Sequence, residues 1–442
     1  MKNKEKSRRE ALENIEKLYK RIDKLMDYLP DSFPKAWKDK VYDTLTKDNS
    51  LNELINSIKE SRPPRIMVMG RTGVGKSSLI NAILGSYYAP VSDVYAQTRG
   101  AESYIYKDGD RNLIEILDTR GLSESIALDE SESAEKRLSR ELTKFMPDLA
   151  IFMLSASHRD DVSADVDFLK NLIDDFKKET NLDLPVVVVI NKVDELAPSR
   201  IKNPLEYPES KQKNIVDMKK YYGQIIEKGK LKIKSLQSTS SLIDWKLGDK
   251  FIDVESIEAL DKQDKSALSI GFDGRYGIDQ LIDILEETIS DKDALMGLRL
   301  ATRIDKIIEQ MADNLINVFA TLTSTIAVTP IPVADIYPLI ILQSGLIYLL
   351  ASLGGEEISI KASRDFIFSL GSIGGAGIFF RFASRQLVKL LFPAAGSLVS
   401  AGIAAMGTKT IGKAGKSYYI DGIDFKKVKK VFKRDQKKNK KA

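Results

Sequence analysis

The segment GRTGVGKSS, residues 70–78, constrains the fold of this chain more than any other feature. An apolar run, residues 66–69, precedes it, and a second apolar run, residues 79–84, follows it. When a glycine-rich loop connects a strand to a helix, the backbone N–H groups of the loop and the N-terminus of the helix point at one phosphate group. The sequence therefore predicts a phosphate-binding loop between a strand and a helix.

The loop fits the whole pattern G-x-x-x-x-G-K-[ST]. In this pattern the lysine, here Lys76, pairs with the β- and γ-phosphates, and the hydroxyl of Ser77 ligates Mg²⁺. A glycine-rich turn without a ligand is the alternative, and the complete pattern in this context disfavours it. The residues expected around the phosphates are Gly70, Arg71, Thr72, Gly73, Val74, Gly75, Lys76, Ser77 and Ser78.

A second motif indicates the base. The run Pro185–Ile190 has the composition of a buried parallel strand, and Asn191-Lys192-Val193-Asp194 follows it. This NKxD sequence resembles the guanine-specificity motif of translation-factor-class GTPases. The resemblance implies that Asp194 accepts hydrogen bonds from the guanine N1–H and exocyclic amine, with Asn191 and Lys192 completing the site. An unpaired buried carboxylate would cost on the order of several kcal/mol, which would exclude ATP.

Two further elements lie between these motifs. Residues 113–117 read as a strand and lead into Asp118-Thr119-Arg120-Gly121, a DxxG sequence. Thr98 lies between the first helix and a strand expected at residues 103–107. In the family that these motifs resemble, the aspartate holds the Mg²⁺ shell through water, the glycine N–H contacts the γ-phosphate, and the threonine closes over Mg²⁺. The residues assigned to catalysis by this resemblance are Lys76, Thr98 and Gly121.

Together, the four motifs resemble those of small Ras-like GTPases of the Era/septin-like branch, over about half of the chain. The resemblance implies an α/β P-loop G domain, with a mostly parallel sheet and helices on both faces, that binds GTP or GDP with Mg²⁺ and hydrolyses GTP. Leu122 stands where many relatives have a glutamine that orients the attacking water, so we expect slow hydrolysis. Gly73 stands where potassium-activated relatives have an asparagine, so potassium activation is not expected.

The fifth motif of the family has no clear match. We expect a strand near Leu231–Leu236 and a loop behind the base after it, and Ser240 and Ser241 are candidates because they follow that strand. The segment Gly271–Leu281 resembles the glycine-aromatic lead-in to the last helix of the domain.

The chain has no cysteine and one histidine, His158. The absence of cysteine excludes disulfides, thiol catalysis and zinc–thiolate or iron–sulfur sites, and it agrees with a reducing compartment. No visible partner makes His158 part of a catalytic triad, so we interpret it as a loop residue near the nucleotide. The basic N-terminus leads into no apolar stretch, so a cleaved secretory signal is not expected.

At 442 residues, the chain is long enough for several domains. Apolar residues at helical spacing from Leu12 to Leu29 predict one amphipathic helix, and a similar stripe extends from Leu295 to Val318. We expect these stripes to pack together in one helical module. The expected domains are 1–62, N-terminal amphipathic helices; 63–290, G domain; 291–424, apolar helical domain; and 425–442, polybasic tail.

Residues 315–408 contain nine charged residues in 94 and resemble a bacterial helical domain often fused to Era-like GTPases, domain of unknown function 697. Residues 336–353 and 390–407 each form an uncharged run of 18 residues, the lower limit for a spanning helix. If both spanned, five basic residues between them would violate the positive-inside rule. We therefore favour a compact apolar domain that touches or partly enters the bilayer over a two-span anchor.

The segment 425–442 carries ten Lys or Arg residues against one acidic residue. Such a cluster is attracted to anionic lipid by about 1 kcal/mol per basic residue, whereas two phenylalanines are too few for stacking on RNA bases. We expect a cytoplasmic GTP-binding switch at the inner face of a membrane, partnered by anionic lipid or a membrane protein rather than nucleic acid. A homodimer through the G domain or helical domain is left open. The alternatives are a ribosome-assembly or RNA-associated GTPase and a GTP-binding scaffold without hydrolysis.

Overall fold

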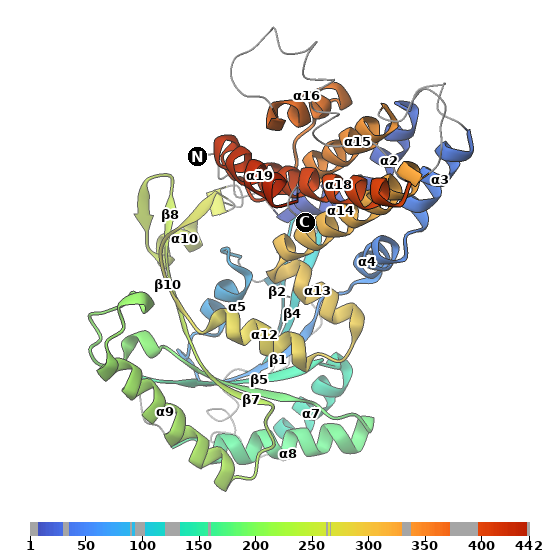
Figure 1. Cartoon of the computed structure of the whole chain (residues 1–442). Helices are drawn as coiled ribbons and strands as arrows, with labels where there is room; N and C mark the ends of the chain where they lie inside the picture. Colours follow the sequence, from blue (N-terminus) through green and yellow to red (C-terminus); the bar gives the residue numbers. More distant parts are fainter. Residues whose placement is uncertain are drawn as a thin grey trace. The chain divides into compact units, whose positions relative to one another are not determined.

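The computed structural model of the protein describes residues 8–29, 35–88, 91–92, 102–119, 133–157, 161–261, 264–265, 267–328, 337–371 and 397–439. The chain divides into two compact units. One unit is Glu60–Arg303, and the other combines Met1–Lys59 with Ile304–Ala442. Figure 1 labels many of the helices and strands of both units.

The unit Glu60–Arg303 is built on a seven-stranded sheet with the order β2-β3-β4-β1-β5-β6-β7. The strands β4, β1, β5, β6 and β7 are parallel, whereas β2 and β3 form an antiparallel edge. This arrangement confirms the expected mostly parallel sheet. The strands are β1 (Arg65–Met69), β2 (Val91–Ser92), β3 (Glu102–Asp108), β4 (Arg111–Asp118), β5 (Leu149–Ser155), β6 (Val186–Asn191) and β7 (Ser235–Ser238).

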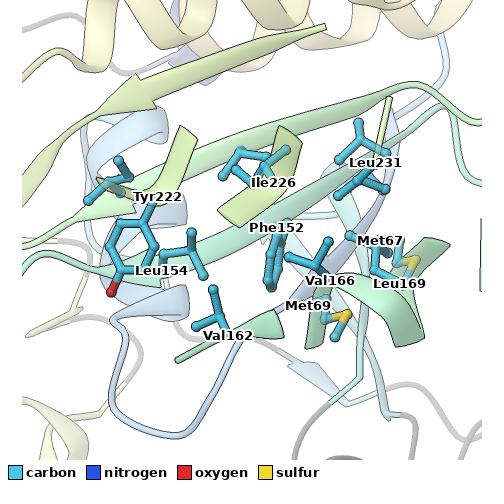
Figure 2. Close-up of a cluster of buried hydrophobic side chains, with 14 of the residues drawn as sticks. Met67, Met69, Phe152, Leu154, Val162, Val166, Leu169, Tyr222, Ile226 and Leu231 are labelled. Carbon is cyan, nitrogen blue, oxygen red and sulfur yellow. The ribbon is translucent and has the colours of Figure 1, made fainter. Parts of the chain in front are cut away.

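Helices cover both faces of this sheet (Figure 1). One face carries α5 (Lys76–Leu84), α12 (Ile278–Thr288) and α13 (Lys292–Thr302), and the other carries α7 (Ser133–Phe145), α8 (Ser163–Thr180) and α9 (Glu209–Lys228). Successive side chains of a strand point to opposite faces, so Met67 and Met69 of β1 enter one core and Ile66 and Val68 the other. Figure 2 shows the first core, where side chains of β1 and β5 meet those of α8 and α9. Apolar packing on both faces explains why the central strands are continuous apolar runs.

A second, three-stranded antiparallel sheet is inserted between β7 and α12. It contains β8 (Ser240–Leu247), β9 (Lys250–Ile252) and β10 (Leu268–Tyr276), with α10 (Val254–Ala259) between the last two. The short helices η1 (Val193–Glu195) and η2 (Pro204–Glu206) lie between β6 and α9. Because β8 begins two residues after β7 ends, a strand stands where the sequence predicted a loop.

The other unit is helical in its described residues. Its helices α14 and α15 pack against α18, and α1 and α2 contact this group. The apolar stripe from Leu12 to Leu29 is buried as expected, but it belongs to two helices that are separated at Lys17. The helices are α1 (Arg8–Glu16), α2 (Leu18–Asp27), α3 (Lys35–Lys47), α4 (Asn49–Glu60), α14 (Ile304–Val328), α15 (Tyr337–Leu353), α16 (Ile360–Gly371), α18 (Ser397–Tyr419) and α19 (Phe425–Asn439).

The helix expected from Leu295 to Val318 is two helices, α13 and α14, with a break at Arg303. Arg303 leaves the helical conformation, and its guanidinium pairs with Asp283 and Glu286 at 2.6 and 2.9 Å. Leu298 of α13 is buried in the core beneath α5 and α12. The N-terminal stripe therefore packs against α14, as expected. The α13 part of the second stripe belongs to the unit Glu60–Arg303 instead.

Helix α15 covers most of the first uncharged run and is apolar on all sides, because neighbouring helices surround it. Close packing of α18 depends on a glycine: a Cβ atom on Gly412 would lie 2.7 Å from a side-chain carbon of Ile316. Residues 390–396 of the second run lie outside the described residues. Among the helices of the described ranges, none combines the length and the apolar character that crossing a bilayer requires.

Candidate nucleotide-binding site

The loop between β1 and α5 owes its shape to its glycines. Gly73 and Gly75 have φ angles of 80° and 89°, in the left-handed region that disfavours residues with a Cβ atom. A Cβ atom on Gly70 would also lie 2.8 Å from the Met153 carbonyl oxygen. The loop therefore forms the strand–loop–helix geometry that the sequence predicted, with α5 beginning at Lys76.

Lys76 and Asp118 are brought together by the parallel pairing of β1 with β4. The Lys76 ammonium donates to the Gly70 carbonyl at 2.7 Å and lies 3.7 Å from a carboxylate oxygen of Asp118. Both residues line one small pocket with Ser77. A hydroxyl and a carboxylate are the oxygen donors that suit Mg²⁺, so these residues fit the metal that the motif implies. Tyr104 and Tyr106 of β3 line the same pocket.

The side chain of Arg71 extends away from the loop. Its guanidinium donates to the Asp165 carboxylate at 2.8 Å and to the Asp161 carbonyl at 3.0 Å, at the start of α8. The loop is thereby fastened to the helix that follows β5. Thr98, Gly121, Leu122 and His158 lie outside the described residues, so their predicted roles stay predictions.

Asn191 connects the phosphate loop with the region of the NKxD motif. It is buried, and its amide nitrogen donates to the Val74 carbonyl at 2.9 Å. Its amide oxygen accepts hydrogen bonds from the hydroxyls of Thr239 and Ser241 at 3.1 and 2.9 Å. One side chain therefore joins the phosphate loop, the end of β6 and the start of β8. The next residue, Lys192, has a φ of 67°, and its ammonium lies 3.5 Å from Glu195.

Asp194 is buried in η1, and its two carboxylate oxygens have different partners. One accepts a hydrogen bond from the Ser240 hydroxyl at 2.9 Å, and the other lies 2.9 Å from the Lys202 ammonium. The structure thus places the two serine candidates, Ser240 and Ser241, against Asp194 and Asn191 respectively. Sequence reasoning missed Lys202, Thr239 and Lys211, because polar residues in loops and on a charged helix resemble solvated surface.

One family model matches the segment from β1 to the end of β6. Residues 65–192 match the model of a protein family described as 50S ribosome-binding GTPase. This segment is a P-loop GTPase G domain. The branch within the GTPases and the resemblance of the helical region to domain of unknown function 697 stay predictions.

Two curated relatives are similar to parts of this chain. GTPase Der of Desulforudis audaxviator (strain MP104C) is 34% identical over 30% of this chain, and the uncharacterized protein YkfA of Escherichia coli (strain K12) is 42% identical over 22%. These matches span 28% of Der and 32% of YkfA, about a third or less of each relative. The crystal structure of a probable GTP-binding protein engB is 17% identical, with a TM-score of 0.25, over 51% of this chain and 98% of that one.

Proposed function

We propose that the chain binds GTP and GDP with Mg²⁺ and hydrolyses GTP slowly, as a nucleotide-dependent switch. The geometry around Asp194 carries this proposal. Each carboxylate oxygen has two lone pairs, and Ser240 and Lys202 use one on each oxygen. One acceptor position per oxygen is left for the guanine N1–H and exocyclic amine. The similarity of part of the chain to the GTPase Der supports the same function.

The phosphate side of the site supplies the groups that a triphosphate requires. Lys76 and the N-terminus of α5 provide positive charge, while Ser77 and Asp118 provide oxygen ligands for the metal. Bound Mg²⁺ would neutralise charge on the β- and γ-phosphates. We propose that Thr98 closes over the metal and that the Gly121 N–H contacts the γ-phosphate. Leu122 stands where a glutamine would orient the attacking water, so hydrolysis is slow. Single-turnover hydrolysis of GTP measures the resulting rate.

The replacement Asp194→Asn tests the base assignment. Xanthine has an oxygen where guanine has its exocyclic amine, and the asparagine amide can donate to that oxygen. We expect Asp194→Asn to weaken GDP binding by at least about 100-fold and to improve binding of xanthosine diphosphate, measured by isothermal titration calorimetry. Asp183→Asn, at a side chain that is 83% exposed, is the matched control. An unchanged preference for GDP in Asp194→Asn would refute the assignment.

We further propose that the switch acts at the inner face of a membrane and that helix α19 contacts anionic lipid. Val428 and Phe432 of α19 are buried, and its first residue, Phe425, makes an edge-to-face contact with Phe366 of α16. The apolar side of this helix therefore packs within its own unit. The opposite side exposes a basic face, which consists of Lys426, Lys427, Lys430 and Arg434.

Because the apolar side of α19 is already packed, its attraction to a bilayer is electrostatic. At about 1 kcal/mol per basic residue, the four residues of the basic face contribute on the order of 4 kcal/mol at low salt. We expect the chain to float with vesicles that contain phosphatidylserine and not with pure phosphatidylcholine. Replacement of all four residues by glutamine should abolish flotation. Binding to RNA without binding to anionic vesicles would overturn this part of the proposal in favour of an RNA-associated GTPase.

A further inference from the structure

Lys211, in the first turn of α9, is a lysine whose side chain is fully buried. Its ammonium donates to the backbone carbonyls of Asp194 at 2.6 Å, Ile201 at 2.9 Å and Leu196 at 3.0 Å. The Pro198 carbonyl lies slightly farther away, at 3.4 Å. All four carbonyls belong to the loop 194–201, which begins with the aspartate of the NKxD motif.

The surroundings of this ammonium are adapted to a positive charge. Lysine is almost never fully buried unless it is paired, and the three nearest carbonyls match its three N–H donors. The ring of Tyr207 adds a cation–π contact at 4.6 Å. Burial lowers the pKa of Lys211, and the negative charge of Asp194 opposes this shift. Carbonyl dipoles and an aromatic face therefore stabilise the positive charge of the Lys211 ammonium.

The loop held by Lys211 connects Asp194 with the lysine that contacts the Asp194 carboxylate. Asp194 is at its start, and Lys202, whose ammonium contacts that carboxylate, directly follows its end. Without the ammonium, three carbonyl oxygens would point at one another in a buried space, and each unsatisfied buried carbonyl is unfavourable. The loop would have to open to let water in, and Asp194 and Lys202 would move with it.

We propose that Lys211 is a positioning residue for guanine recognition. Its ammonium fixes the curvature of the loop 194–201 and thereby aims the Asp194 carboxylate at the base. This inference rests on the proposed function, in which Asp194 reads guanine. It adds a residue that lies outside the GTPase motifs and reaches the base through another side chain.

The ratio of the affinities for GDP and inosine diphosphate tests this role. Hypoxanthine differs from guanine only in lacking the exocyclic amine that donates to Asp194. A misplaced carboxylate lowers this ratio toward one, whereas partial unfolding lowers both affinities equally and leaves the ratio unchanged. For Lys211→Met, which keeps most of the side-chain volume, we expect GDP affinity to fall by about 10- to 100-fold and the ratio to collapse. Lys213→Met, at an exposed lysine of the same helix, should retain the wild-type ratio.

Chemical rescue separates the ammonium from the alkyl chain. Lys211→Ala leaves a space with the shape of n-propylammonium, next to the same carbonyls. Refolding this variant with n-propylammonium should restore the ratio, whereas n-propanol should not. Should the methionine and alanine variants fail to fold without the amine, Lys211→Arg takes their place, because its planar fork cannot donate in the same three directions.

The outcomes distinguish this inference from the proposed function. A wild-type ratio in a folded Lys211→Met, Lys211→Ala or Lys211→Arg variant overturns the positioning role. A wild-type chain that binds GDP and inosine diphosphate equally, together with an Asp194→Asn variant that behaves like wild type, overturns the proposed function instead. Rescue by n-propylammonium that restores the ratio supports both.

Discussion

Asn191 lies where the phosphate side and the base side of the proposed site meet, and its replacement measures how strongly they are coupled. The Asn191→Ala variant loses hydrogen bonds to Val74, Thr239 and Ser241. Thr239 and Ser241 are buried, with 0% and 8% of their surfaces exposed. The change therefore leaves one carbonyl and two hydroxyls without their partner in the interior.

The expected cost follows from these three groups. A buried polar group that loses its partner costs about 1–3 kcal/mol, which sets a ceiling of about 9 kcal/mol. The two hydroxyls can rotate toward other acceptors, and water can enter the space that the amide leaves. We therefore expect Asn191→Ala to lower the unfolding free energy of the unit Glu60–Arg303 by about 3–5 kcal/mol. Asn191→Asp keeps the acceptor for both hydroxyls but sets a carboxylate against the Val74 carbonyl, so we expect a smaller loss at low pH than at neutral pH.

Urea unfolding followed by the fluorescence of Trp245 suits this measurement. Trp245 lies in β8, close to Ser241, and Trp37 is the one other tryptophan of the chain. In a Trp37→Phe background the signal reports the unit that contains Trp245, which matters because a chain with two units need not unfold in one step. GDP affinity is measured on the same variants. If the unfolding free energy of Asn191→Ala lies within about 1 kcal/mol of that of its parent, and its GDP affinity equals the parental value, the coupling of the phosphate side with the base side is refuted.

Three further replacements test other parts of the structure. Lys76→Ala should abolish GTP binding and leave the circular dichroism spectrum intact; normal GTP affinity would contradict the site. Arg275 lowers the pKa of Asp273 below its ordinary 3.8 by a hydrogen bond, so this pair stabilises the fold above pH 3.8 and the contribution is lost as the pH falls. Asp273→Asn should therefore cost up to about 1 kcal/mol at pH 7, with the difference vanishing in acid-titration urea curves. Gly412→Ala should destabilise by about 1–3 kcal/mol through overpacking, whereas Gly407→Ala, in open space on the same helix, should stabilise by up to about 1 kcal/mol; equal effects on the thermal midpoint would argue against the close packing of α18.

The parts of the fold that sequence reasoning predicted are those with a strong local signal. The strands β1, β5 and β6 are buried on both faces, so their apolar runs are continuous. The glycine loop is recognisable because positive φ angles at Gly73 and Gly75 require glycine. Ser240 and Ser241 were proposed from chain order alone, and their hydroxyls donate hydrogen bonds to Asp194 and Asn191.

The parts that sequence reasoning missed depend on tertiary contacts. The helix breaks at Lys17 and Arg303 interrupt stripes whose periodicity continues on both sides, and the Arg303 break is accompanied by ion pairs to Asp283 and Glu286. Lys211 lies in a helix rich in charged residues, so its burial has no local signature. The small sheet was missed because β8 shows no regular alternation of buried and exposed residues.

Because β8 follows β7 directly, a movement of the small sheet would move residues that contact the proposed guanine site. Ser240 and Ser241 are the first residues of β8, and Ser240 pairs with Tyr276 of β10 across the sheet. A partner that binds the small sheet and displaces β8 by a fraction of an ångström would pull both hydroxyls away from Asp194 and Asn191. Coupling between two binding sites is reciprocal. Such a partner would therefore bind the nucleotide-free protein more tightly than the nucleotide-bound protein, by the same factor by which it lowers the affinity for the nucleotide. A factor that accelerates nucleotide exchange would therefore have no need to enter the nucleotide site.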